Sequence, residues 1–124
     1  MSIEQVIDTS VWLEYFAGSE KAKKIIENGN IGSSIITLAE LADKFEREDR
    51  EFESALNFII ASATILPVTV EIAILAAKLK KQIRKKHSKF GLADALHLAS
   101  AKSENAIFVT TDNDFAGVNG ALVI

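Results

Sequence analysis

The sequence contains no cysteine, only two histidines and a single proline among its 124 residues. Without cysteine, the chain cannot form disulfides, zinc knuckles or iron–sulfur clusters, and it has no thiol nucleophile. Two histidines are too few for a His-rich metal site, so we expect any bound metal to be held by oxygen ligands. Long hydrophobic runs are also missing, since apolar runs such as those at 35–36 and 58–61 are far too short to span a bilayer.

No export signal is present either, because residues 1–25 lack a basic start followed by an apolar run and a small-residue cleavage site. The composition, with 48% hydrophobic and 25% charged residues, is ordinary for a globular protein. A chain of this length builds one core. We therefore expect a soluble, cytoplasmic protein with a single domain over residues 1–124.

The basic residues are unevenly distributed along the chain. The formal net charge is −3, from 17 acids and 14 bases. Residues 78–89 contain no acid and seven of the 14 bases: Lys78, Lys80, Lys81, Arg84, Lys85, Lys86 and Lys89. Such a run is typical either of a solvated helix face or of a footprint for a phosphate backbone, and spacing alone does not choose between them.

Short apolar runs alternate with segments of helical periodicity. The runs predict buried strands at 3–7, 31–36, 63–68 and 106–109, with a final edge strand at 121–124. Helices are predicted at 11–17, 19–28, 52–60, 72–83 and 92–103, and another follows the second strand. This alternation predicts an α/β three-layer sandwich, a parallel sheet of four or five strands flanked by helices. Pro67, late in the third strand, indicates an edge position there.

Acidic residues lie where the predicted strands end. Asp8 follows the first strand, Glu40 falls in the first turn of the helix after the second, and Asp112 and Asp114 follow the fourth. Asp94 opens the helix that leads into the fourth strand. Because ligands of open α/β sheets bind beyond the carboxyl ends of the strands, we expect these acids to face one pocket.

Each acid also has an ordinary structural explanation. Asp8 and Asp94 suit helix starts, residues 112–114 suit a turn, and Thr37-Leu-Ala-Glu40 fits a capping box. Their joint placement favours a site, because two carboxylates about 4 Å apart repel by roughly 4 kcal/mol at an effective dielectric near 20. Protonation that raises the pKa of one or more carboxyls can relieve this repulsion, but a divalent cation such as Mg²⁺ does so better. Paired ions also activate water, which then attacks phosphodiesters.

Polar neighbours of these acids have two interpretations. The hydroxyls of Thr9, Ser10 and Thr110 either orient carboxylates and metal-bound water or serve only as caps and turn residues. His97 lies among apolar neighbours in its helix, so we interpret it as a packed or surface residue rather than a general base.

Four segments match a known family in order and spacing. They are residues 6–10 (VIDTS), 36–41 (ITLAEL), 91–99 (GLADALHLA) and 109–115 (VTTDNDF). Over nearly its whole length the sequence resembles the PIN-domain ribonucleases, and among them the VapC-type toxins of VapBC toxin–antitoxin pairs. The resemblance implies Mg²⁺ or Mn²⁺ in an acidic pocket and hydrolysis of single-stranded RNA.

The resemblance also assigns the site residues and partners. The metal-binding and catalytic acids correspond to Asp8, Glu40, Asp94 and Asp112, with Asp114 close enough to substitute for Asp112 or to assist it. The family implies an antitoxin, and an antitoxin Arg or Lys inserted among the carboxylates would displace the metal. The family also favours homodimers.

An acidic pocket repels RNA, so nearby cations must attract it. We predict that Lys85 and Lys86, just before the helix that carries Asp94, bind RNA. Trp12, Tyr15 and Phe16 offer faces for base stacking, although such a cluster is more often core or dimer surface.

Other functions fit the sequence less well. A PIN-domain nuclease in RNA processing, without an antitoxin, is the main alternative, and a PIN scaffold that binds without cutting is another. A receiver domain has a similar fold, but it needs an acceptor Asp after the third strand and a Lys after the fifth. Here the third strand ends at Pro67-Val-Thr69 and the fifth ends the chain.

Overall fold

Residues 2–124 are described by a computed structural model, and they form one sheet between two layers of helices. The sheet has five strands in the order β3-β2-β1-β4-β5, and every neighbouring pair is parallel. The strands are β1 (Gln5–Ile7), β2 (Ile31–Ser34), β3 (Thr64–Leu66), β4 (Ile107–Thr110) and β5 (Ala121–Val123). The predicted α/β architecture is confirmed, including the edge positions of β3, which Pro67 follows, and of β5.

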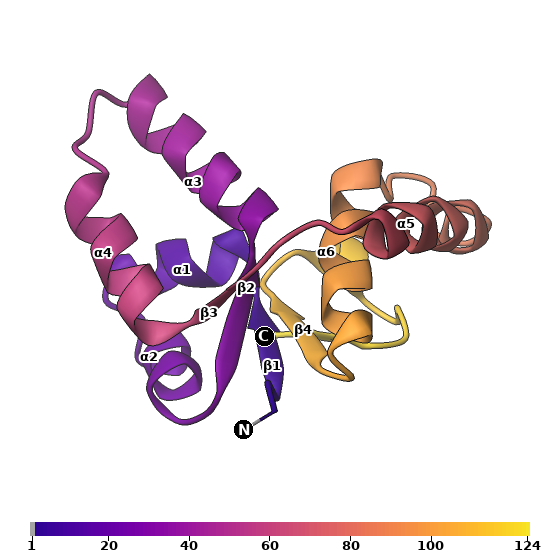
Figure 1. The fold of residues 1–124 in the computed structure, drawn as a ribbon, viewed down its shortest axis with the longest axis horizontal. Helices are drawn as coiled ribbons and strands as arrows, with labels where there is room; N and C mark the ends of the chain where they lie inside the picture. The colour runs from indigo at the N-terminus through magenta and orange to yellow at the C-terminus, as the bar shows by residue number, and fades with distance from the viewer. Residues whose placement is uncertain (1) are drawn as a thin grey trace.

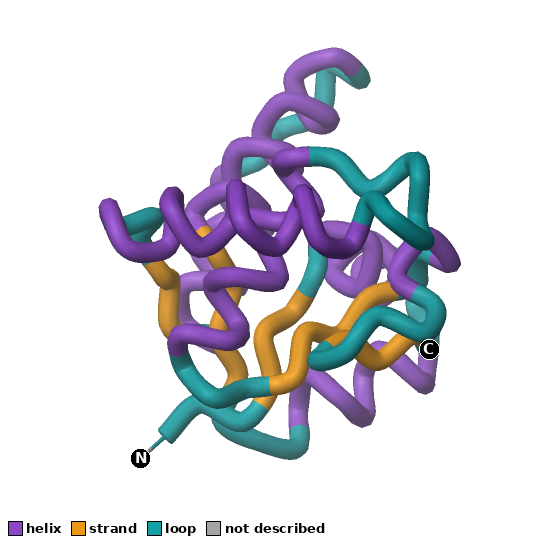
Figure 2. Tube along the Cα trace, turned by 90° about the vertical axis from the view of Figure 1, so that its right-hand side faces the viewer, coloured by secondary structure: helices purple, strands orange, loops and turns teal. Residues whose placement is uncertain are grey.

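Six helices cover the two faces of the sheet. They are α1 (Thr9–Phe16), α2 (Glu20–Glu27), α3 (Ile35–Arg47), α4 (Glu53–Ser62), α5 (Val70–Ile83) and α6 (Leu92–Ser103), and a short 3₁₀ helix, η1, spans Asn113–Phe115. Helices α1 to α4 lie on one side of the sheet, and α5 and α6 lie on the other (Figure 1). The view in Figure 2 shows the strands next to one another, with helices in front and behind. Within the described residues, no helix is long and apolar enough to cross a membrane.

Neighbouring residues of the central strands pack into two separate hydrophobic cores, one on each face of the sheet. Val6 and Phe108 pack in a cluster with α5 and α6, whereas Ile7 and Val109 pack in a second cluster with α1 to α4. All four side chains are fully buried. Because successive strand residues point to opposite faces, a sheet covered on both sides requires continuous apolar runs, which is the pattern of this sequence.

The boundary between β2 and α3 differs from the sequence prediction. The run 31–36 was expected to be all strand, but β2 ends at Ser34, and the Ser34 hydroxyl accepts the N–H of Thr37 as the N-cap of α3. The predicted capping box is therefore wrong: Thr37 lies inside the helix, and Glu40 lies in the second turn rather than the first. The β-branched pair at 35–36 is compatible with a strand or a helix. Because Ser34 caps the helix, the helix begins at residue 35 and includes both residues.

The aromatic cluster after Asp8 belongs mainly to the core. Trp12 is fully buried, and its indole N–H donates to Ser33 Oγ at 2.8 Å. Tyr15 stacks on Phe58 with ring centroids 5.1 Å apart, and Phe16 packs edge-on against the same ring at 6.2 Å. Trp12 is thus not available to stack on a base.

Candidate metal centre

Asp8 lies at the carboxyl end of β1, in the middle of the sheet. Its side chain is only 8% exposed, and its carboxylate accepts hydrogen bonds from the hydroxyls of Ser10 and Thr110, each at 2.7 Å. Although Asp8 is the N-cap of α1, its side chain does not cap the helix. The expected capping role is therefore not used, and the carboxylate is oriented by hydroxyl groups instead.

These two hydroxyls also tie the ends of β1 and β4 together. Ser10 Oγ accepts the N–H of Thr111 at 3.0 Å, and Thr110 Oγ1 accepts the N–H of Asp112 at 3.0 Å. The distance between the two hydroxyl oxygens is 3.4 Å. The structure thus places two of the three predicted supporting hydroxyls against Asp8, and their bonds fix its position relative to the start of the 111–114 segment.

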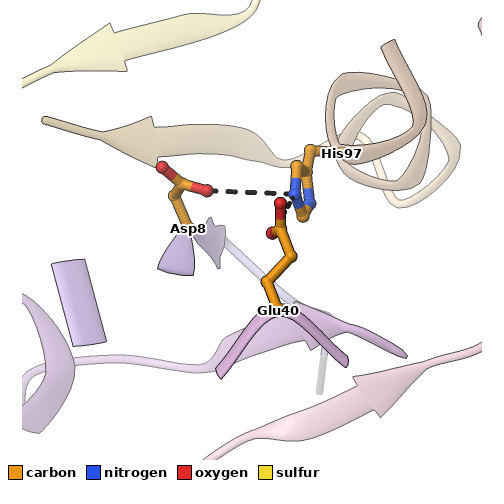
Figure 3. A group of neighbouring side chains, drawn as sticks. All are labelled: Asp8, Glu40 and His97. Atoms are coloured by element: carbon orange, nitrogen blue, oxygen red, sulfur yellow. Dashed lines mark hydrogen bonds and ion pairs between the residues drawn. The ribbon is translucent and has the colours of Figure 1, made fainter. Parts of the chain in front are cut away.

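Glu40 reaches the same place from the second turn of α3. Its Oε1 accepts a hydrogen bond from Thr9 Oγ1 at 2.6 Å. The same oxygen accepts a second bond from His97 Nε2 at 2.8 Å, which is drawn in Figure 3. Partial burial raises the pKa of the Glu40 carboxyl, but the hydrogen bonds from His97 and Thr9 and the charge of His97 outweigh it. The net result is a pKa below the usual value, so Glu40 is held ionised.

His97 sits between these two acids. It is 3% exposed, its Nε2 lies 4.0 Å from Asp8 Oδ1, and its ring stacks on Phe108 with centroids 5.4 Å apart. Its Nδ1 lies 3.1 Å from the hydroxyl of Ser34. Asp8, Glu40 and His97 each offer a ligand atom, all within 4.8 Å of one another. The interpretation of His97 as packed is correct in its burial, but it missed the imidazole's contact with the acids.

Asp94, in the first turn of α6, belongs to a second acidic group. Its Oδ2 accepts the N–H of Gly91 at 2.8 Å, so the expected role at a helix start is confirmed. Burial raises the pKa of the Asp94 carboxyl, and the charges of Asp112 and Asp114 raise it further. The hydrogen bond from Gly91 and the charge of His97 lower this pKa, but the net shift is upward. Asp112 and Asp114 therefore lie close enough to repel it.

The acids of the turn after β4 serve as turn residues and also lie near Asp94. Asp112 accepts the N–H of Asp114 at 2.9 Å and so begins η1, as a turn residue would. Its charge nevertheless acts on Asp94. The predicted gathering of acids at this edge is thus found as two groups, Asp8–Glu40 and Asp94–Asp112–Asp114, which His97 couples. Among the described side chains, no hydrogen bond joins the two groups directly.

No lysine or arginine compensates these carboxylates within residues 2–124. The ion pairs of basic side chains lie elsewhere, between Lys44 and Glu48, Arg47 and Asp43, and Arg50 and Glu48. A partly buried set of carboxylate oxygens with excess negative charge is the donor set that Mg²⁺ or Mn²⁺ prefers. The residues present therefore fit such an ion, with the oxygen ligands expected from the sequence, and His97 Nε2 contacts one of them, Glu40.

Lys85 and Lys86, predicted to bind RNA, lie exposed in the turn between α5 and α6. Lys86 and Asp114 line a common hollow of about 300 Å³. The basic run therefore reaches the second acidic group, as its position before α6 suggested.

Comparison with known protein families gives a match over most of the chain. Residues 6–121 match the PIN domain family, which confirms the resemblance seen in the sequence. A search of curated protein sequences gave no match.

Solved structures of toxin–antitoxin proteins share the fold. A toxin–antitoxin complex from Klebsiella pneumoniae is similar at 24% identity and a TM-score of 0.77, covering 97% of both chains. VapBC2 from Rickettsia felis, bound to a promoter DNA fragment, is similar at 18% identity and a TM-score of 0.80, covering 98% of both. VapC20 from Mycobacterium tuberculosis, a toxin that cleaves the sarcin-ricin loop, is similar at 18% identity and a TM-score of 0.72, covering 94% of this chain and 96% of that one. At these identities the likeness concerns the fold.

Proposed function

The chain belongs to the PIN domain family, and on that premise we propose that it is a metal-dependent endoribonuclease that hydrolyses phosphodiester bonds of single-stranded RNA. We propose further that it is the toxin component of a type II toxin–antitoxin pair. The observation that carries the proposal is the set of carboxylates at one edge of the sheet that no lysine or arginine of the described chain neutralises.

In this proposal Asp8, Glu40, Asp94 and Asp112 hold Mg²⁺ or Mn²⁺. Such an ion, when bound, makes water nucleophilic and stabilises charge on the phosphate and the leaving oxygen. The chain's own contribution is orientation. Ser10 and Thr110 hold the Asp8 carboxylate in place, since both hydroxyls donate to its Oδ2.

Glu40 is positioned to handle the attacking water. Its Oε1 is occupied by the hydrogen bonds from Thr9 and His97, whereas its Oε2 accepts none from the described side chains. Because the carboxyl is held ionised, Oε2 can accept a hydrogen bond from water and orient it. His97 acts here through Glu40, as a positioning residue.

Two protein partners belong to the proposal, an antitoxin and a second copy of the chain. The Klebsiella and Rickettsia structures, similar in fold, are of toxin–antitoxin pairs, which supports the first. An antitoxin arginine or lysine would supply the cation that the acids lack. Exposed apolar side chains such as Val70 and Ile74, one turn apart on α5, offer surface for the second.

Cleavage of defined single-stranded RNAs tests the activity. We expect cleavage with Mg²⁺ or Mn²⁺, none with a chelator, and loss of cleavage in Asp8→Asn and Asp94→Asn. The matched control is Asp43→Asn, which removes an exposed carboxylate from α3 outside the site. Activity that survives chelation, or that survives both site substitutions, contradicts the mechanism.

Expression in a bacterial host tests the toxin role. The chain alone is expected to arrest growth, and Asp8→Asn is expected to relieve the arrest. Metal-dependent cleavage in vitro without growth arrest favours a PIN-domain nuclease of RNA processing, and binding of RNA without cleavage favours a non-cleaving scaffold.

A further inference from the structure

Two adjoining hollows lie between the turn that follows α5 and the loop around η1. The first, of about 300 Å³, separates residues 86–90 from Asn113 and Asp114. The second, of about 410 Å³, separates residues 82–83 and 85–87 from residues 117–119, and we call it the Asn119 hollow. Lys86 and His87 line both hollows, so the two adjoin, and we call them together the track. Asp114 lines the first hollow, and its N–H donates to Asp112, so the track starts beside the second acidic group.

Both walls of the track are anchored. On one side the Arg84 guanidinium donates to the Ser88 carbonyl at 3.0 Å, and fully buried Phe90 packs edge-on against Phe115 at 5.3 Å. On the other side the N–H of Val118 donates to the Phe115 carbonyl at 3.0 Å. Gly117, at φ +78°, allows the tight turn there. A preformed hollow costs little ordering when a ligand binds.

The lining combines cations with an apolar floor. Lys85, Lys86 and Lys89 are exposed, and none lies within 4.0 Å of a carboxylate of the described chain. Free cations beside an acidic centre attract phosphates that the acids would repel. Half-buried Ile83 and buried Val118 supply the apolar part of the lining. Exposed Asn119 also lines the hollow, and its amide offers one donor group and one acceptor.

We propose that the Asn119 hollow binds one unpaired nucleotide of the RNA substrate, next to the acidic centre. Lys85 and Lys86 contact the phosphates, the base lies over Ile83 and Val118, and Asn119 hydrogen-bonds the base edge. Recognition of single-stranded RNA commonly combines cationic contacts to phosphates, a surface for the base and hydrogen bonds to the base edge. Here aliphatic side chains take the place of the usual aromatic surface. The inference rests on the proposed endoribonuclease function. It adds to that function the surface that binds the RNA strand beyond the acidic centre, and the side chain, Asn119, that distinguishes one base from another.

Binding of fluorescently labelled single-stranded RNA tests the cationic wall. All variants carry Asp94→Asn and are measured with Mg²⁺ by fluorescence anisotropy, so that the RNA stays intact. Lys85→Ala with Lys86→Ala is compared with Lys78→Ala with Lys81→Ala, which removes the same charge from the same basic run but outside the hollow. We expect the first pair to weaken binding about tenfold and the second less than about threefold.

Oligonucleotides that differ at a single base test the readout. Asn119→Ala is expected to reduce the preference between bases about fivefold or more, whereas Asn57→Ala, at an exposed position of α4, leaves it unchanged. Circular dichroism confirms that each variant is folded.

The outcomes separate this inference from the proposed function. Equal losses from the two lysine pairs, an unchanged base preference in Asn119→Ala, or equal affinity for duplex RNA each overturn the hollow as a nucleotide site. If the protein without Asp94→Asn still cleaves RNA with Mg²⁺ in that case, the nuclease proposal stands. A chain that binds no RNA overturns both.

Discussion

The two acidic groups of the centre are stabilised in opposite ways. Asp8 and Glu40 receive hydrogen bonds from three hydroxyls and one imidazole, and the pKa of Glu40 is lowered. Asp94 has one backbone donor and two neighbouring carboxylates, and its pKa is raised, first by burial and then by these charges. The first group is compensated from within the chain, and the second is not.

This difference indicates where an external cation is most needed. Asp94, Asp112 and Asp114 would supply most of the attraction for a divalent ion, while Asp8 offers a preoriented carboxylate. The chain thus tolerates repulsion in the free protein, which is a cost often seen at functional sites. The same repulsion would favour an inserted antitoxin cation.

The largest expected effect comes from removing the preoriented ligand. Asp8→Asn keeps the shape of the side chain but loses its charge, so cleavage is expected to fall by more than about 100-fold, because even residues that only support metal ligands cost 10–100-fold. Saturating Mg²⁺, at about 100 times its Kd, should raise the free energy of unfolding of the native protein by roughly 2.7 kcal/mol and that of Asp8→Asn far less. Urea titration with and without Mg²⁺ measures this, and an equal gain in both proteins contradicts the role of Asp8.

The second largest effect is expected from Ser34, which contacts His97 and so supports the Asp8–Glu40 group. Ser34→Ala removes the N-cap of α3 and also the hydroxyl beside His97 Nδ1. We expect the free energy of unfolding to fall by about 2–3 kcal/mol, the sum of a lost cap and a buried imidazole nitrogen without a partner.

A second serine cap isolates the contribution of the imidazole. Ser19 caps α2 by accepting the N–H of Ala22 at 3.3 Å and has no contact with the site. Ser19→Ala should therefore cost only about 1 kcal/mol. Equal losses in the two variants, measured by chemical denaturation, would show that Ser34 acts as a helix cap alone and does not hold His97.

Much of the frame that brings these groups together could be predicted from the sequence. Apolar runs and helical periodicity predict a parallel sheet, and α6 begins and ends at the predicted residues, 92 and 103. Parallel topology then requires residues that follow β1 and β4 to lie at one edge, which is why Asp8 and Asp112 could be placed at the same edge of the sheet without coordinates.

The contacts of His97 could not be predicted from the pattern that surrounds it. Its neighbours in α6 are apolar because the helix packs on both the sheet and α5, so apolar neighbours do not reveal which side the imidazole faces. The three-residue spacing from Asp94 is the usable signal, since it places both side chains on one face of the helix. The side-chain direction of Glu40 could not be predicted either, because the sequence analysis started α3 too late and so put Glu40 in the first turn of the helix.

The smallest expected effect compares the two acidic groups most directly. Neutralising one carboxyl in each group should change the free energy of unfolding in opposite directions. With chelator present, Asp94→Asn should raise the free energy of unfolding, and Glu40→Gln should lower it, each by less than about 1 kcal/mol because both carboxyls are partly solvated. Glu46→Gln, exposed on the same helix as Glu40, is the control and should change little.

The pH dependence has the corresponding signs. The folded-state pKa of Asp94 is raised, so the native protein loses stability as pH rises from 3.8 through that pKa, and Asp94→Asn removes this loss. The folded-state pKa of Glu40 is lowered, so its contribution is complete above 4.5 and is lost as pH falls through the folded-state pKa. Urea titrations between pH 3 and 8 measure both slopes. If the two variants shift stability in the same direction at neutral pH, the acids form one evenly compensated cluster, and the need for an external cation cannot be assigned to the Asp94 side.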